Sequence, residues 1–416
     1  MNEIRDILIG IDLGEKVSQI CYYDRRRQEP VEVTMKVGSA CYESPSCVCW
    51  REKSQEWSMG LEAEYFAREQ GGILVENFYH LCEEDLKISV GGQMREPWEL
   101  AAAYIQGMIH FLGSREPVKN TKCLAVTVPN LNGNMVKNLQ KACESIGYSK
   151  DQLLLADYSE SFYYYAYCQR LDFRTRNIGW YAFDENQVTF RRLYASAGGK
   201  LTFVRLSDPV HAELGESAED KDFDFCQFLI NTLGNDLYSS IYITGHGFDQ
   251  EWAKTKSIPI LCRQKRKVFE GNNLFVKGAC YAAKEQLEDK KLKGFLYLGD
   301  ALVKTNVGME MQVMGTPAYY ALIEAGKNWY DCQSDCEILL DGREDLTFLV
   351  ARMDETSSQK VKMKLPGLPK RPNKTTRLHL HLEYTAAGVC QIRVEDLGFG
   401  EFYPSSRKVW TETAHW

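Results

Sequence analysis

The stretch that decides the fold is Ile7-Leu8-Ile9-Gly10-Ile11-Asp12-Leu13-Gly14. A second β-rich run follows it, Val17-Ser18-Gln19-Ile20-Cys21-Tyr22-Tyr23-Asp24. Two such runs around a tight turn predict a β-hairpin that carries the carboxylate of Asp12 at its tip. Gly14 has no side chain, so the backbone amides of the turn can face a small anion. The pattern is therefore typical of a phosphate-binding hairpin.

A second hairpin of the same form is predicted at 178–194. Its first strand is Ile178-Gly179-Trp180-Tyr181-Ala182-Phe183-Asp184, and the second half of the hairpin is Glu185–Tyr194. Two such hairpins in one chain indicate two half-domains that face each other across a cleft. The turn of the second hairpin contains no glycine, which argues against phosphate binding there.

The composition sets limits on the class of protein. A chain of 416 residues, 44% hydrophobic and 26% charged, should form two or three domains with buried cores. Its net charge of -7 argues against general binding to nucleic acid or to acidic membranes. We therefore expect neither nucleic acid nor membrane as a partner.

Cysteine usage and the N-terminal residues indicate a cytoplasmic protein. No signal peptide and no run of the ~18 apolar residues that a membrane span needs are visible. We expect the 14 cysteines to be mostly reduced and buried. Cys47 and Cys49 lack a matching second pair at zinc spacing, and so do Cys332 and Cys336, so we expect no metal site.

The first part of the chain alternates strands with helices, which predicts an α/β fold. Pro97 suits the first turn of an amphipathic helix that continues through Leu112. Further helices are predicted at 61–68, 134–146, 157–167, 223–233 and 274–283, with strands at 31–37, 47–51, 123–129, 153–155 and 240–248.

Beyond Lys290 the pattern changes to strands separated by turns. Phe295–Asp300 is short and apolar, as a docked linker strand would be. Strands are then predicted at 305–313, 318–324, 336–340, 347–353, 359–365, 378–384 and 390–394, which favours an all-β sandwich. His379 and His381 share one face of a strand, and without a third ligand we interpret that face as solvated.

The order of these motifs resembles the actin-like ATPase superfamily, and within it the DnaK-type heat-shock chaperones. Gly10–Gly14 resembles the first phosphate motif, and Asp157–Tyr165 the connecting segment that is usually Asn-Glu-Pro-Thr-Ala-Ala. Thr244–Gly247 resembles the adenosine motif, Gly278–Ala283 the helix behind it, and Leu296–Asp300 the interdomain linker.

The resemblance implies a duplicated, ribonuclease-H-like domain at 1–294 and a hydrophobic linker at 295–304. It implies a β-sandwich at 305–416 that is similar to the chaperone substrate-binding β-domain. If ATP or ADP binds with magnesium, the residues that the resemblance places around it are Asp12, Gly14, Asp157, Asp184, Thr189, Gly245 and Gly247. No catalytic residue and no direct metal ligand is expected.

Departures from the family pattern matter for function. The second phosphate loop is usually Asp-Leu-Gly-Gly-Gly-Thr, whereas residues 184–189 are Asp-Glu-Asn-Gln-Val-Thr, so side chains stand where backbone amides should approach phosphate. The family lysine near the γ-phosphate aligns with Tyr79, and a carboxylate after the second loop with Arg191. The stretch 190–244 is too short for the lobe that covers adenine, and no helical lid is expected after the β-domain.

We therefore expect a catalytically degenerate DnaK-like protein that binds a protein or peptide partner through its β-domain, with no cofactor. One alternative is a weak or atypical ATPase that binds magnesium and ATP. A second alternative is an actin-like structural or assembly protein.

Overall fold

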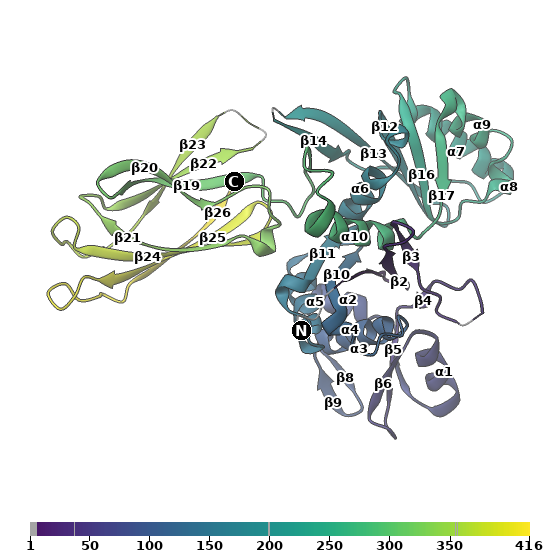
Figure 1. Cartoon of the computed structure of the whole chain (residues 1–416), viewed down its shortest axis with the longest axis horizontal. Coiled ribbons are helices and arrows are strands. Elements are labelled where there is room, and N and C mark those ends of the chain that lie inside the picture. The colour runs from purple at the N-terminus through teal and green to yellow at the C-terminus, as the bar shows by residue number, and fades with distance from the viewer. Residues whose placement is uncertain (1–5, 37, 199, 354, 356) are drawn as a thin grey trace. The chain divides into compact units, whose positions relative to one another are not determined.

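The computed structural model describes residues 6–36, 38–198, 200–353, 355 and 357–416. The chain forms two units, Met1–Gly299 and Asp300–Trp416 (Figure 1). The first unit is mixed α/β and the second is built from strands. The boundary between them lies within 295–304, the stretch that the sequence indicates as a linker.

The first hairpin lies at the centre of a sheet with the strand order β11-β10-β1-β2-β3, in which β4 also pairs with β2. Strand β1 is antiparallel to β2 and parallel to β10. Its residues Ile9 and Ile11 are fully buried, as expected for a central strand. The bounds are β1 (Ile7–Leu13), β2 (Val17–Asp24), β3 (Glu29–Glu32), β4 (Ser44–Pro45), β10 (Thr121–Val128) and β11 (Leu153–Asp157).

The second hairpin lies at the centre of another sheet, with the order β17-β16-β12-β13-β14-β18 and β15 paired to β13. Strand β12 is antiparallel to β13 and parallel to β16. The strands β14, β13, β12, β16 and β17 thus repeat the order and directions of β3, β2, β1, β10 and β11. The bounds are β12 (Asn177–Asp184), β13 (Gln187–Gly198), β14 (Leu201–Leu206), β15 (Val210–Glu213), β16 (Tyr238–His246), β17 (Lys267–Glu270) and β18 (Phe295–Tyr297).

Two helices, α6 (Tyr158–Cys168) and α10 (Leu274–Lys284), join the two sheets (Figure 1). A Cβ atom on Gly278 of α10 would lie 2.0 Å from the carbonyl oxygen of Ser161 on α6, so the helices cross at a glycine. A Cβ atom on Gly10 would lie 2.5 Å from the carbonyl oxygen of Val276, so α10 also packs closely on β1. Side chains larger than hydrogen do not fit at these two contacts.

The remaining helices lie around these layers. Helix α3 begins at Pro97, and the side chain of Glu99 accepts a hydrogen bond from the backbone of Glu96 in a capping box. Helices α7, α8 and α9 pack on the second sheet through a core that includes Tyr181 and Phe225. The bounds are α1 (Gly60–Gln70), α2 (Phe78–Glu84), α3 (Pro97–His110), α4 (Pro117–Asn120), α5 (Gly133–Ser145), α7 (Ala218–Leu233), α8 (Gln250–Ala253) and α9 (Ser257–Leu261).

Short strands between β4 and α3 form two small sheets, β6-β5-β7 and β8-β9. Their bounds are β5 (Val48–Arg51), β6 (Glu56–Met59), β7 (Ile73–Val75), β8 (Ile88–Val90) and β9 (Gln93–Arg95).

The second unit contains two antiparallel sheets, β20-β19-β22-β23 and β21-β24-β25-β26. Side chains alternate between buried and exposed along β22 and β24, and the ring of Phe348 lies 6.4 Å from that of Trp416. This arrangement is a β-sandwich. The bounds are β19 (Thr305–Val313), β20 (Thr316–Ile323), β21 (Gln333–Leu340), β22 (Asp345–Arg352), β23 (Ser358–Lys364), β24 (Thr376–Ala386), β25 (Val389–Gly398) and β26 (Val409–His415).

Two predicted elements differ from the structure by five residues at one end. The strand predicted at 31–37 ends at Glu32, and Val37 lies outside the described residues. The helix predicted from Phe223 begins at Ala218, because the side chain of Ser217 accepts a hydrogen bond from the backbone N–H of Asp220 and caps the helix there.

Candidate functional site at the first hairpin

Asp12 lies within strand β1 rather than at the tip of the hairpin, which corrects the sequence-based expectation. It pairs with Gln19 of β2, and its side chain is only 5% exposed. The turn is formed by the residues after Leu13, where β1 ends. The carboxylate therefore points into the protein instead of projecting from the end of a loop.

Tyr158 fills the space beside this carboxylate. Helix α6 begins there because the side chain of Asp157 accepts a hydrogen bond of 2.7 Å from the backbone N–H of Glu160. The Tyr158 hydroxyl donates a hydrogen bond of 2.7 Å to Oδ1 of Asp12. The same hydroxyl lies 3.1 Å from the position that a Cβ atom on Gly14 would take. The Tyr158 hydroxyl thus lies beside both Asp12 and Gly14.

The electrostatics of Asp12 follow from this burial. Desolvation raises the pKa of Asp12 to about 7; the hydrogen bond from Tyr158 opposes this rise, and the charge of Glu43 adds to it. The pKa of Tyr158 is also raised, mainly by burial and then by the charge of Asp12. At neutral pH the pair therefore carries less negative charge than an exposed aspartate would.

Three aromatic side chains, which we call the aromatic bridge, link the two sheets. Tyr158 stacks on Phe275, with ring centroids 3.9 Å apart, and Phe275 contacts Trp180 at 5.6 Å. The indole N–H of Trp180 donates a hydrogen bond of 2.9 Å to the hydroxyl of Thr244. A continuous line of contacts thus runs from Asp12 on β1 to Thr244 on β16.

The second hairpin brings together Asp184, Gly245 and Gly247, because β12 and β16 end side by side. A Cβ atom on Gly245 would lie 1.8 Å from the carbonyl oxygen of Phe183, and one on Gly247 would lie 2.1 Å from that of Glu185. Both glycines also have positive φ angles. Backbone packing by itself thus requires glycine at both positions.

Other residues singled out in the sequence make hydrogen bonds of their own. Thr189 on β13 shares a hydrogen bond of 2.9 Å with Nδ1 of His211. Arg191 donates a hydrogen bond of 3.0 Å to the hydroxyl of Ser159 at the start of α6. Tyr79 is buried, and its hydroxyl accepts a hydrogen bond of 3.3 Å from the backbone of Asn130.

The sequence did not identify Tyr158, Phe275 and Trp180 as parts of a site. The signal that could have indicated Tyr158 is the crowding of aromatic residues at 157–167.

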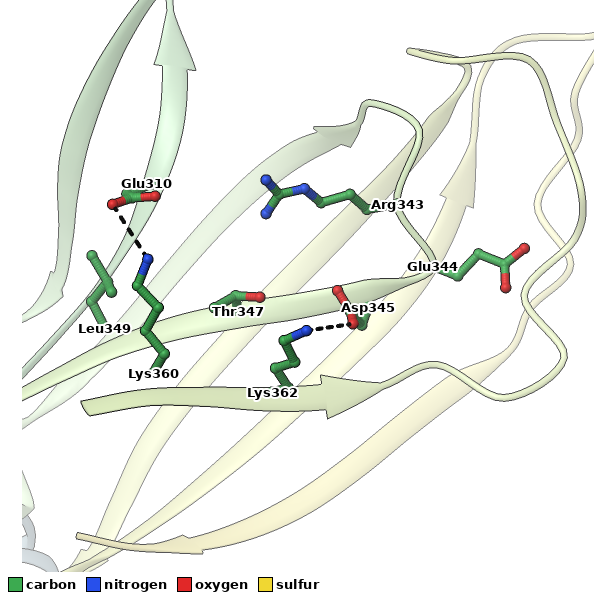
Figure 2. Close-up of a pocket in the computed structure, with 8 residues that line it drawn as sticks. All are labelled: Glu310, Arg343, Glu344, Asp345, Thr347, Leu349, Lys360 and Lys362. Carbon is green, nitrogen blue, oxygen red and sulfur yellow. Dashed lines mark ion pairs between the residues drawn. The ribbon is translucent and has the colours of Figure 1, made fainter.

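A second candidate surface lies on the β-sandwich unit. An open cavity of about 460 Å³ is lined by charged and polar side chains from β19, β22, β23 and the loop before β22 (Figure 2). Its lining residues are Glu310, Arg343, Glu344, Asp345, Thr347, Leu349, Lys360 and Lys362. Such a surface is suited to polar contacts with another chain.

Metal ligands, cysteines and apolar helices were also considered in the described part of the chain. There, no group of three or more His, Cys, Asp or Glu side chains is placed to hold a metal ion. The cysteines are free thiols, most of them buried. Among the described helices, none is long and apolar enough to cross a membrane.

The protein thus consists of an α/β unit followed by a unit built from strands. A family model described as the C-terminal part of the family of unknown function DUF5716 matches residues 29–300. A second model, for the domain of unknown function DUF8552, matches residues 302–416. The chain belongs to the DUF5716 family, because the first match covers more than half of it. No curated protein matches the sequence.

Proposed function

We propose that this chain is a protein-binding member of the actin-like superfamily with a DnaK-type order of domains, and that it acts without a nucleotide. The observation that carries the proposal is the placement of Tyr158, which covers Gly14 and binds Asp12 where a nucleotide phosphate and its magnesium would lie.

The repeated sheet supports the superfamily assignment. Both sheets of the first unit have the same strand order and directions, and each is followed by a helix, α6 or α10, that enters the crossing between them. This duplication is what the actin-like fold requires. The two four-stranded sheets of the second unit agree with a chaperone-type β-domain.

The closed first hairpin argues against the ATPase alternative. Tyr158 lies in Asp157–Tyr165, the segment that resembles the connecting motif of the family. The Tyr158 hydroxyl donates a hydrogen bond to Oδ1 of Asp12 and its ring stacks on Phe275, so this carboxylate oxygen and the space beside it are already occupied. In addition, a carboxyl group whose pKa is about 7 is a weak partner for hydrated magnesium.

The glycines of the adenosine motif give no independent support for nucleotide binding. In active relatives such glycines let a ligand approach the backbone. Here Gly245 and Gly247 are explained by their contacts with the carbonyl oxygens of Phe183 and Glu185.

The β-sandwich unit is the part that we expect to bind a partner. It exposes a cavity lined by charged groups, and it exposes large side chains on β20, where Tyr319 is 53% and Tyr320 is 44% exposed. Strand β20 is also at the end of its sheet. Edges of this kind accept extended segments of other proteins.

An immobilised-protein assay tests the proposal. The full chain and the fragment 1–299 are each incubated with reduced, carboxymethylated α-lactalbumin, an unfolded client, and with the folded protein as the control. We expect the full chain to retain the unfolded client, the fragment to lose it, and Mg-ATP or Mg-ADP to leave the retained amount unchanged. Equal retention by the fragment, or release by ATP, would contradict the proposal.

A further inference from the structure

Strand β23 ends its sheet, and in the described part of the chain its recorded neighbour is β22. From Lys360 onward its side chains alternate: Lys360, Lys362 and Lys364 are exposed on one face, whereas Val361 is half-buried and Met363 is buried on the other. The outer edge of β23 therefore offers unpaired backbone N–H and C=O groups beside a row of ammonium groups.

This lysine face forms one wall of the open cavity in Figure 2. The strand register places Thr347 opposite Lys362 and Leu349 opposite Lys360, so these two β22 side chains form the neighbouring surface. Glu310 of β19 lines the far side. An extended segment that pairs with β23 would thus place every second side chain next to the lysines and the cavity.

Three cations and three carboxylates line this surface, and the two lysine ion pairs recorded there are long. Nζ of Lys360 lies 3.9 Å from Glu310, and Nζ of Lys362 lies 3.8 Å from Asp345, so both ion pairs are long. An ammonium group has three donors and a guanidinium group has five. Arg343 is exposed, and no ion pair to another described residue is recorded for it.

The orientations of two loop residues shift this balance toward donors. In Figure 2 the guanidinium of Arg343 extends back toward the other labelled side chains, whereas the carboxylate of Glu344 points away from them. The groups near Thr347 that can still form hydrogen bonds are therefore mainly N–H donors. A carboxylate can accept hydrogen bonds from them.

We propose that an extended acidic segment of a partner protein adds to the free edge of β23, with carboxylates at alternate residues that face Lys360, Lys362 and Lys364. The inference rests on the proposed function, because it names the kind of segment that the second unit binds. The proposal also explains why lysines occupy this edge: they select which strands can pair with β23. A row of lysines on an edge opposes the addition of uncharged strands, and a matching row of carboxylates removes that opposition.

Two labelled peptides of identical composition test the spacing. One alternates glutamate with threonine and valine, and the other carries the same glutamates as one block. We expect the full chain to bind the alternating peptide more tightly, and we expect added salt to weaken that binding. Lys360→Gln and Lys362→Gln should each weaken it by about 1.5- to fivefold.

Lys374→Gln is the matched control, because Lys374 is as exposed as Lys362 but pairs with Asp341 in a loop outside β23. It should leave binding unchanged. Equal affinity for the two peptides would show charge attraction without strand addition and would overturn the inference. Failure to bind either peptide, with the unfolded client still retained, would overturn this inference and leave the proposed function standing.

Discussion

Replacement of Arg371 by leucine is expected to destabilise the β-sandwich unit by about 3–5 kcal/mol, the usual cost of leaving a buried charge without its partner. Two hydrogen bonds, of 2.7 and 2.8 Å, join the guanidinium to both carboxylate oxygens of Asp396. The two side chains are 6% and 0% exposed, so water cannot replace the lost contact. Hydrogen exchange of the β24 and β25 amides measures the loss locally.

Two comparisons make this result interpretable. The double variant R371L/D396L should recover much of the stability, because it leaves no charge unpaired. Arg393→Ala should cost at most about 0.5 kcal/mol, since its pair with Glu395 is exposed to solvent. A cost for Arg371→Leu no larger than that for Arg393→Ala would show that the buried pair does not hold the unit together.

The same pair predicts a dependence on pH. Burial by itself would raise the pKa of Asp396, but hydrogen bonds from Arg371, Ser406 and Gly398 hold it well below its usual range. A carboxyl group whose folded-state pKa is lowered stabilises the protein above its unfolded pKa of ~3.9. The difference between wild type and Arg371→Leu should therefore shrink as the pH falls below ~4.

Replacement of Glu288 by alanine is expected to cost the first unit about 2–4 kcal/mol, because three charge-assisted partners are lost. Glu288 lies in the turn that extends α10 and is 14% exposed. Its carboxylate accepts hydrogen bonds from Arg25 at 2.9 Å, Lys122 at 2.7 Å and Lys284 at 2.6 Å. Without it, Arg25 still pairs with Asp6 and Lys284 with Asp289, but Lys122 loses its pair with Glu288.

Urea denaturation of the full chain measures this effect. Glu116→Ala is the matched control, because Glu116 forms an ion pair with Lys119 in which both side chains are more than half exposed.

The hydrogen bond from Arg25, together with those from the two lysines, holds the pKa of Glu288 below its usual range despite burial. The stabilisation should thus be present above ~4.3, the unfolded pKa, and fade below it. Equal costs for the two variants would contradict this account.

Local patterns were sufficient to predict much of the fold. Helix α3 could be placed because Pro97 and its apolar spacing act within one segment, and the strands of the sandwich follow from alternation. Strand β26 was missed because Trp410 and Ala414 are its buried side chains and the rest of it is exposed. A mostly polar strand of this kind gives little periodic signal.

The candidate site was harder to predict because its central contact is not local. Tyr158 and Asp12 are 146 residues apart, and only the folded chain brings the hydroxyl to the carboxylate. The motif around Asp12 predicted a hairpin, which is present, but it could not show that the side chain lies within the strand. Likewise, the glycines at 245 and 247 indicated a ligand, although neighbouring carbonyl oxygens also require them.

The most direct test of the central claim, that Tyr158 closes the first hairpin to nucleotide, is isothermal titration of the full chain with Mg-ATP and Mg-ADP. We predict no saturable heat for either nucleotide. Thermal unfolding provides a check, because a ligand at a hundred times its dissociation constant would add ~2.7 kcal/mol to the stability. Saturable binding that weakens on Asp12→Asn or Asp184→Asn would contradict the account and establish the cleft as a nucleotide site.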